Sequence, residues 1–518
     1  MADNAESISR KFIEVAGRGG RAIQVRPDAL HIIATDAERA LIASGAPLYV
    51  RGGLVKPVLD EMPAAHGRKT KVARLCEVDA DCLTDHMSRA ASWTKFNSRK
   101  NDWVPTDPPR SVALTIVSRD GEWQFSRLSG VITTPTLRPD GTILSEPGYD
   151  EATQLLLLDP PALPAIPDKP TRDDALRALA ALDLLIEEFP FANEASRSAA
   201  LSALITCVVR GALAAVPMHA TTAPVAGSGK SYIIDVASGL NLGDFAPVIT
   251  AGRTEEETEK RLVSALLNGQ SVISIDNVNG DLGGDLLCQM IERPIVSVRP
   301  LGSSKLVKVE NRACVFATGN NIRLVGDMTR RVILCTLDPK TERPELRQFK
   351  SDPFAMVMAD RGKFIAAALT ICRAYAVAGY PKQCRPLASF EDWSRIVRSA
   401  LVWLGCVDPA ETMEQARADD PETTSLRSLL RAWRTEFLGE FVSTGRAIER
   451  SKDNFNGQYT APDLHHAMQA VAESKGTLSA IRLGKFLSSK KGRIIDGLRF
   501  IDSEDSHSKQ KVWSVEEV

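Results

Sequence analysis

Residues 220–231 read ATTAPVAGSGKS, and this stretch decides the fold. It follows an apolar segment and leads into SYIIDVASGL, which has the pattern of a helix. Glycines in such a turn let backbone N–H groups point inward at phosphate oxygens, and the start of the next helix favours the same negative charge. The stretch therefore predicts a strand, a phosphate-binding loop and a helix. The loop comprises Pro224, Val225, Ala226, Gly227, Ser228, Gly229, Lys230 and Ser231.

Two residues of this loop have expected chemical roles. Lys230 can reach the β- and γ-phosphates of ATP, and Ser231 can offer its hydroxyl to Mg²⁺. The first glycine of the usual G-x-x-x-x-G-K-[ST] pattern is replaced by Pro224. The strand-loop-helix context still predicts an ATP site that uses Mg²⁺.

A carboxylate is expected beside this loop. The apolar run SVISID ends in Asp276, and an aspartate at the end of a strand can hold Mg²⁺ through a water molecule. Many related ATPases carry a glutamate next, but this chain has Asn277. An amide can orient a water molecule but cannot accept its proton. Asp281 or another acid could replace the missing base, or turnover could be slow.

Polar residues also follow a third apolar run, CVFATGNN. Asn320, favoured here over Asn321, can contact the γ-phosphate or the attacking water. The segment GDMTRRVIL then places Arg330 and Arg331 side by side. In a ring of identical subunits one of them could enter the neighbouring site and stabilise charge in the transition state. The sequence leaves the choice between the two open.

The composition sets wide limits on the class of protein. The chain has 518 residues, 44% hydrophobic and 25% charged, with a formal net charge of -1. These ordinary values exclude a disordered or collagen-like chain and a uniformly basic nucleic-acid coat, while local basic sites remain allowed. Nine cysteines without a C-x-x-C pair, and an opening MADNAESISRKF unlike a secretory leader, predict a cytoplasmic protein. Arg210 and Arg373 interrupt the longest apolar stretches, so no membrane contact is expected.

The pattern along the chain predicts a multidomain α/β protein. Residues 1–160 should form an α+β domain in which PLYVRGGLVKPVL and SVALTIVS are strands and RPDGTI is a hairpin turn. Residues 161–214 hold a proline-rich linker and two helices, and 215–350 alternate strands with helices around the loop. Residues 351–450 read as helical, and 456–518 as a small α+β module.

The order of these motifs resembles that of the superfamily 3 and minichromosome-maintenance helicases, both of the AAA+ class. The nearest resemblance is to helicase-like replication proteins of prophages, integrative elements and staphylococcal cassette elements, over about residues 190–350. The matching segments are FPF, SRSAALSALIT, APVAGSGKS, EEETEKRL, ISIDN, SVRPLGSSK, ATGNN, GDMTRR and ERPELRQF. The resemblance implies an AAA+ ATPase core with a helical lid over 351–450. It also implies a homo-oligomeric ring, as in a hexamer, that acts on single-stranded or forked DNA, with element-encoded replication proteins as possible partners.

Helicases of this kind carry a β-hairpin before the strand that bears the sensor. Here PIVSVRPLGSSKLVKVENR occupies that place, with Lys305 at or beside the tip and Arg299 and Lys308 near it. The resemblance implies that such hairpins line a pore and contact the DNA backbone. An ordinary surface hairpin with solvated charge is the alternative.

The C-terminal segment is locally basic. Residues 475–511 contain nine Lys or Arg against four Asp or Glu. A helix over TLSAIRLGKFLSSKKGR, followed by two strands over RIIDGLRFI and KQKVWSV, resembles a winged-helix DNA-binding module. Its candidate DNA contacts are Arg482, Lys485, Lys490, Lys491 and Arg493.

Three functions therefore remain in view. The first is an ATP-dependent DNA helicase or translocase of mobile-element or phage replication. The second is a primase-helicase, because Asp79 and Asp81 form a D-x-D pair, although no clear apolar strand precedes it and a DNA collar or oligomerisation domain is preferred. The third is an ATP-switched loader or regulator that separates no strands.

Overall fold

The computed structural model describes residues 22–63, 69–252, 254–302, 304, 306–474, 476–505 and 510–518, and these form two compact units. The larger unit comprises Met1–Gly280, Gly284–Ile322 and Arg331–Ala410. The smaller comprises Asp281–Gly283, Arg323–Arg330 and Glu411–Val518. The architecture is a mixed α/β fold with several sheets, one of them parallel. No helix in the described part of the chain is long and apolar enough to cross a membrane.

A five-stranded sheet carries the phosphate loop. Its strand order is β13-β14-β17-β12-β18, and β12 pairs in parallel with both of its neighbours. All six residues of β12 are buried, as expected for a strand covered on both faces. The predicted alternation of strands and helices over residues 215–350 is confirmed for the five strands of this sheet. These are β12 (Met218–Ala223), β13 (Val248–Thr250), β14 (Val272–Leu282), β17 (Cys314–Leu324) and β18 (Val332–Thr336).

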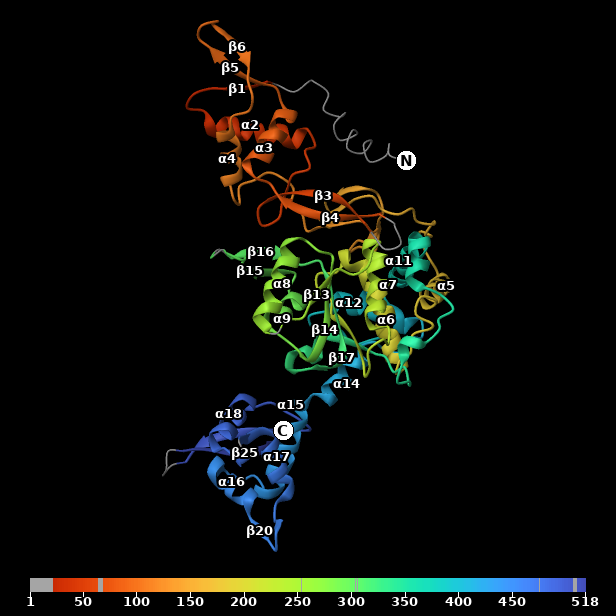
Figure 1. Cartoon of the computed structure of the whole chain (residues 1–518), viewed down its shortest axis with the longest axis vertical. Helices are drawn as coiled ribbons and strands as arrows, with labels where there is room; N and C mark the ends of the chain where they lie inside the picture. Colours follow the sequence, from red (N-terminus) through yellow and green to blue (C-terminus); the bar gives the residue numbers. More distant parts are fainter. Residues whose placement is uncertain are drawn as a thin grey trace. The chain divides into compact units, whose positions relative to one another are not determined.

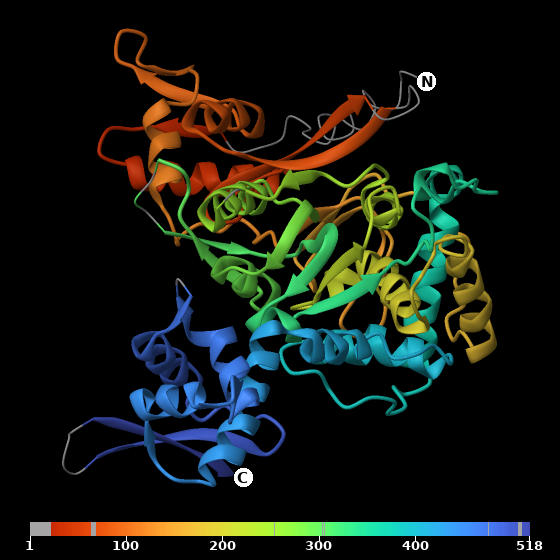
Figure 2. The same cartoon turned by 60° about the horizontal axis from the view of Figure 1, so that its bottom comes forward.

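Helices pack around this sheet. Helix α6 (Glu194–Val209) is buried along almost its whole length and contacts β18 and α7 (Lys230–Leu242). Helix α5 (Arg172–Asp183) begins at a capping box formed by Thr171 and Asp174, and it lies beside α11 (Arg361–Val377) in Figures 1 and 2. Both helices predicted after the linker are confirmed. The remaining helices of this region are α8 (Glu255–Leu267), α9 (Asp285–Glu292), α10 (Pro353–Ala359), α12 (Glu391–Trp393) and α13 (Ser399–Trp403).

The first part of the larger unit has its own apolar core. Three helices pack together there, namely α2 (Leu30–Ala43), α3 (Ala80–Ala90) and α4 (Arg110–Ser118). They accompany the sheet β1-β5-β6, built from β1 (Ile23–Val25), β5 (Trp93–Asn97) and β6 (Asp102–Pro105). A second sheet joins β2 (Tyr49–Val50), β3 (Leu54–Pro63) and β4 (Lys69–Glu77).

The predicted strand SVALTIVS is wrong, because these residues form helix α4. Val112, Ala113 and Ile116 are buried at helical spacing, whereas a strand would bury alternate residues. The β-branched residues that suggested a strand pack instead against α2 and α3. Tertiary packing here outweighs local preference.

The predicted turn at RPDGTI is confirmed. Strands β8 (Thr136–Leu137) and β9 (Ile143–Leu144) pair antiparallel around it. The N–H of Arg138 donates to the carbonyl of Thr142 at 2.7 Å, and Asp140 accepts from the Thr142 N–H at 2.9 Å. Nearby, β7 (Gly130–Ile132), β10 (Gly148–Asp150) and β11 (Leu155–Leu157) form a small sheet.

The smaller unit is built on the sheet β19-β25-β24 and four of its helices. The rings of Trp433, Phe437 and Phe500 lie close together in its core, and Trp513 is buried with them. The predicted boundaries at residues 450 and 456 fall inside this unit, because its core begins well before them. Its main elements are α14 (Glu411–Asp419), α15 (Pro421–Phe437), β19 (Val442–Ser443), α16 (Thr444–Lys452), α17 (Pro462–Ala472), α18 (Ala480–Lys490), β24 (Leu498–Glu504) and β25 (Lys511–Glu517).

Candidate functional site

The phosphate loop joins the end of β12 to the start of α7. Gly227 and Gly229 have φ angles of 73° and 89°, in the left-handed region that glycine adopts without strain. Val225 O accepts from the Ser228 hydroxyl at 2.7 Å and from Lys230 Nζ at 3.0 Å, so both side chains lie over the loop. No side chain in the described part of the chain caps α7, which leaves its first N–H groups facing the loop for an anion.

The strand register brings the other candidate residues to the same edge of the sheet. Asn320 pairs with Ala223, the last residue of β12, and Asp276 pairs with Thr250. The hydroxyl of Ser231 donates to Oδ1 of Asp276 at 3.4 Å, and Thr318 donates to the same carboxylate. Asp276 therefore links the loop to β14 and β17. Thr318 was not singled out as a functional residue in the sequence, although it lies in the motif that was.

The electrostatics of this edge suit a bound anion. Burial lowers the pKa of Lys230, and the carboxylate of Asp276 opposes that shift. Asn320 Oδ1 is buried and has no hydrogen-bond partner in the described part of the chain. An orphaned buried amide oxygen is costly unless a ligand or water satisfies it.

The donor set fits Mg²⁺. The ion takes few protein ligands and completes its shell with water and substrate phosphates. Ser231 and Asp276 supply a hydroxyl and a carboxylate side by side. Across the described ranges, no cluster of three or more His, Cys, Asp or Glu could hold a metal on its own.

Asn277 stands directly after Asp276, where many ATPases carry a glutamate base, and Asp281 is the candidate acid to replace that base. Asn277 is exposed and has a φ of 58°, a conformation that asparagine tolerates better than most residues. Asp281 forms an ion pair with Arg323 at 2.9 Å. Both side chains of this pair are exposed.

Two segments that the sequence did not assign to the site flank the loop. A side chain at Gly229 would meet the ring of Phe189 at 3.2 Å, and one at Gly227 would meet Glu345 at 3.1 Å. The carboxylate of Glu188 accepts from the backbone of Lys350 at 2.8 Å, which ties the two segments together. FPF and ERPELRQF were the only signals for them, and both came from the resemblance.

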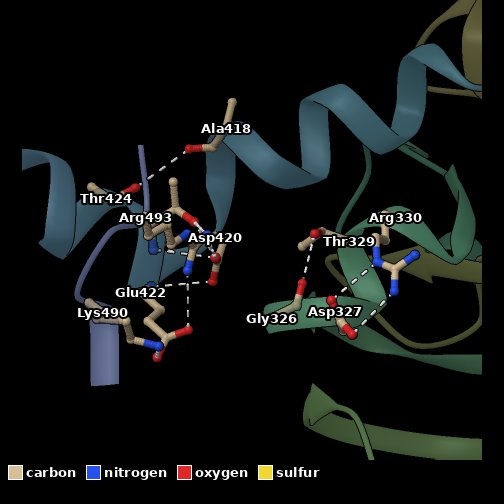
Figure 3. Close-up of polar contacts among 11 residues, drawn as sticks. Gly326, Asp327, Thr329, Arg330, Ala418, Asp420, Glu422, Thr424, Lys490 and Arg493 are labelled. Carbon is tan, nitrogen blue, oxygen red and sulfur yellow. Dashed lines mark hydrogen bonds and ion pairs between the residues drawn. The ribbon is translucent and has the colours of Figure 1, made fainter. Parts of the chain in front are cut away.

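The two candidate finger arginines differ in their surroundings. Arg331 is buried, with its side chain 5% exposed, and pairs with Glu292 at 2.7 Å; Glu292 also accepts from the hydroxyl of Ser389. Arg330 is 37% exposed and pairs with Asp327 at 3.1 Å in a short 3-10 helix, η3 (Gly326–Arg330) (Figure 3). Of the two, only Arg330 presents its guanidinium at the surface.

The predicted pre-sensor hairpin is present. Strands β15 (Ile295–Val298) and β16 (Val307–Glu310) pair antiparallel, with Val298 opposite Val307. Val296, Val298 and Val309 are buried, whereas Arg299 and Lys308 are exposed without an ion-pair partner in the described part of the chain. Lys305 lies outside the described residues.

The basic side chains of the C-terminal unit fall into two groups. Lys490 pairs with Glu422, Arg493 contacts Asp420 and Glu422 at 4.0 and 3.8 Å, and Lys491 pairs with Asp502 (Figure 3 shows the first two). These ion pairs tie the end of α18 to the unit.

Lys485 belongs to the second group, the basic residues that line a groove. It lines an open groove of about 940 Å³ between the start of α16, the exposed face of α18 and β25. Arg482 donates to the carbonyl of Glu473 at 2.6 Å. The groove residues include Ser443, Thr444, Gly484, Lys485, Ser488, Ser489 and Lys511.

The D-x-D pair of the N-terminal segment has structural partners. Asp79 caps α3 by accepting from the Cys82 N–H at 2.7 Å. Asp81 pairs with Arg110 at 2.7 Å, which lowers the pKa of Asp81. The two carboxylates thus serve the helix start and an ion pair.

No protein-family model and no curated protein matches this chain. Among solved structures, the A form apo structure of NrS-1 C terminal region-CTR is similar over 93% of this chain and 98% of that one, at 11% identity and a TM-score of 0.36. The X-ray structure of JCV Helicase is similar over 48% of this chain and 68% of that one, at 13% identity and a TM-score of 0.21. A second JCV Helicase structure, with a bound acetamide compound, shares 14% identity over 48% of this chain and 74% of that one, at a TM-score of 0.21. These likenesses are too slight to assign a family or a function.

Proposed function

We propose that this chain is an ATP-dependent DNA helicase or translocase that acts as a homo-oligomeric ring, as in a hexamer, in the replication of a phage or mobile element. The observation that carries the proposal is the convergence of Lys230, Ser231, Asp276, Thr318 and Asn320 at one edge of a parallel sheet. The strand order places the loop beside the strand that bears Asn320. The five residues match a P-loop ATPase with a sensor in both chemistry and register.

Each residue has a role in this proposal. Lys230 binds the β- and γ-phosphates, and the first turn of α7 binds their remaining charge. Ser231 and Asp276 hold Mg²⁺, which neutralises the charge that develops between these phosphates. Thr318 orients the Asp276 carboxylate, and the orphaned Oδ1 of Asn320 orients the attacking water. Asn277 can position a water molecule without accepting its proton, which favours slow turnover.

The remaining parts supply contacts to DNA and to neighbouring subunits. Arg330 acts on the site of the next subunit, since its guanidinium is exposed. The β15-β16 hairpin contacts one DNA strand through Arg299, Lys305 and Lys308. The smaller unit binds DNA as a winged-helix-like module, a proposal supported by helix α18 followed by the antiparallel pair β24-β25. Element-encoded replication proteins are further candidate partners in the cytoplasm.

The experiment is strand displacement on a forked DNA duplex with purified chain and ATP. Wild type should separate the strands, and Lys230→Ala should not. Lys260→Ala is a matched control, because Lys260 is a surface lysine of α8 paired with Glu256. ATP hydrolysis without strand separation would replace the helicase proposal with a loader or regulator. Primer synthesis on a single-stranded template would instead support a primase-helicase.

A further inference from the structure

An aromatic pair, of which Phe96 is exposed and Trp103 is half-buried, lies on the β1-β5-β6 sheet (Figure 1 labels the three strands). Phe96 of β5 is directly opposite Trp103 of β6, and their ring centroids are 5.7 Å apart at 67°. Phe96 is 50% exposed. Large apolar side chains that gather on one solvent-facing surface often mark a binding site.

The opposite face of the same strand already serves the core. Trp93, three residues before Phe96, is 4% exposed and donates its indole N–H to the Met87 carbonyl at 3.0 Å. Successive side chains of a strand alternate between faces, so Thr94 and Phe96 share the outer face. The aromatic pair is therefore additional to the residues that the core needs.

Basic side chains surround this pair. The guanidinium of Arg26 lies 5.7 Å from the centre of the Trp103 ring, within cation–π range. Arg99 and Lys100 are exposed at the turn of the same hairpin, and no ion-pair partner for them or for Arg26 exists in the described part of the chain. Lys95 is also exposed, but it shares the opposite face of β5 with Trp93. Two acids, Asp28 and Asp102, lie in the same segments, so the local balance is positive.

Hydrogen bonds to Asn97 fix the backbone of the hairpin turn that carries Arg99 and Lys100. The side-chain oxygen of Asn97 accepts from the N–H groups of Arg99 and Lys100, at 3.0 and 3.2 Å. Asn101 closes the turn with a φ of 49°. The cations at the turn therefore follow the position of β5, which carries Phe96.

We propose that this face of the β5-β6 hairpin, with Phe96, Trp103 and Arg26 at its centre, binds single-stranded DNA by stacking on its bases. Exposed aromatic rings beside cations bind single strands without sequence preference, because every base offers a π-face. Arg99 and Lys100 contact the phosphates on either side of the stacked bases. A duplex keeps its bases paired and stacked, so this surface selects single strands. The inference rests on the proposed function for its choice of DNA as ligand.

The test is fluorescence anisotropy of a labelled 20-nucleotide oligothymidylate, measured without ATP over several salt concentrations. Phe96→Ala should weaken binding about 10-fold, and Phe96→Tyr should keep it within about twofold, since a stacking ring is worth a substantial share of the affinity per base. The double variant Arg99→Ala and Lys100→Ala should lower the salt slope by about one to two. Phe96→Tyr keeps an aromatic ring at this position, so it shows whether the loss of binding in Phe96→Ala comes from lost stacking or from misfolding.

The matched control is Leu114→Ala. Leu114 of α4 is 48% exposed and lies in the same part of the chain outside this surface, so its variant should bind as wild type does. Equal affinities for Phe96→Ala and Leu114→Ala would overturn the inference. A changed oligomeric state of Phe96→Ala with unchanged affinity would also overturn it, in favour of a subunit contact. Binding is measured without ATP, so a failure of the wild type to unwind a duplex would count against the proposed function alone.

Discussion

The hydroxyl of Ser231, in the first turn of α7, donates to Oδ1 of Asp276 on β14 at 3.4 Å. Strand β17 lies between β14 and β12, the strand that leads into the loop. Thr318, on the intervening β17, donates to the same carboxylate. The side chain of Asp276 on β14 thus joins the start of α7 to strand β17.

The two adjacent arginines should behave differently. Arg330→Ala should lower ATP turnover by about 10³-fold without changing stability, because an arginine finger acts only on transition-state charge. Arg331→Ala should instead lower the free energy of unfolding by about 3 kcal/mol, because it removes the buried ion pair with Glu292. Steady-state hydrolysis and urea unfolding measure the two effects.

Arg323→Ala is the control for this pair, since Arg323 is exposed and pairs with Asp281. If Arg330→Ala hydrolyses ATP as fast as Arg323→Ala does, Arg330 is not the finger.

Gly319 should tolerate no side chain. A Cβ at this position would lie 2.0 Å from the carbonyl oxygen of Val278, where β14 and β17 meet. Gly319→Ala should therefore cost at least about 3 kcal/mol of unfolding free energy, measured by urea titration. Gly53→Ala has open space around it and should change stability little. Equal stability of the two variants would contradict the close approach of these strands.

Asp235 of α7 should make stability depend on pH. Burial raises its pKa to about 6, although the Ala246 N–H donates to this carboxylate and opposes the shift. Between about pH 4 and 6 the folded chain holds a proton that the unfolded chain has released, so the stability from this group falls as the pH rises through that window.

Asp235→Asn removes the charge. The variant should gain about 1–2 kcal/mol over wild type at pH 8 and almost nothing at about pH 3, where both states of the wild type are mostly protonated. Urea unfolding of both proteins at the two pH values measures the difference. A gain that is the same at both values would show that the carboxyl titrates normally.

Substitutions at the basic residues of the C-terminal unit should also differ in their effects. Lys485→Ala should weaken DNA binding and lower its salt slope by about one, because Lys485 faces the open groove. Lys490→Ala should mainly affect stability, because Lys490 pairs with Glu422 of α15. Fluorescence anisotropy with a duplex DNA probe measures the affinity and salt slope of both variants. If only Lys490→Ala altered the salt slope, Lys490 and not Lys485 would be the DNA contact.

Much of the five-stranded sheet was predictable because its strands are short apolar runs between polar ends. Asp276 and Asn320 follow the apolar parts of β14 and β17, so strand position and chemistry could be inferred together. Both strands continue beyond these residues, to Leu282 and Leu324. The helix at SVALTIVS could not be predicted, because its β-branched residues suit a strand as long as the helices packed against it are unknown. The ion pair between Lys490 and Glu422 could not be predicted either, because it joins residues of α18 and α15 that are far apart in the sequence.

The difference between Arg330 and Arg331 likewise became visible only in the three-dimensional structure. Adjacent residues of one type look equivalent in a sequence, yet one side chain is 37% and the other 5% exposed. The boundary of the C-terminal unit was missed for a related reason. Helix α15 reads like the helices before it, and only its contacts with Phe500 show where it belongs.

Magnesium-dependent ATP hydrolysis by Asp276→Asn tests the central claim most directly. The substitution keeps the shape of the side chain and an oxygen for Thr318 but removes the charge that would hold the metal. Turnover should fall at least about 100-fold, whereas Asp281→Asn, at an exposed acid paired with Arg323, should stay within about twofold of wild type. Undiminished hydrolysis by Asp276→Asn would contradict the account of this sheet edge as the catalytic site.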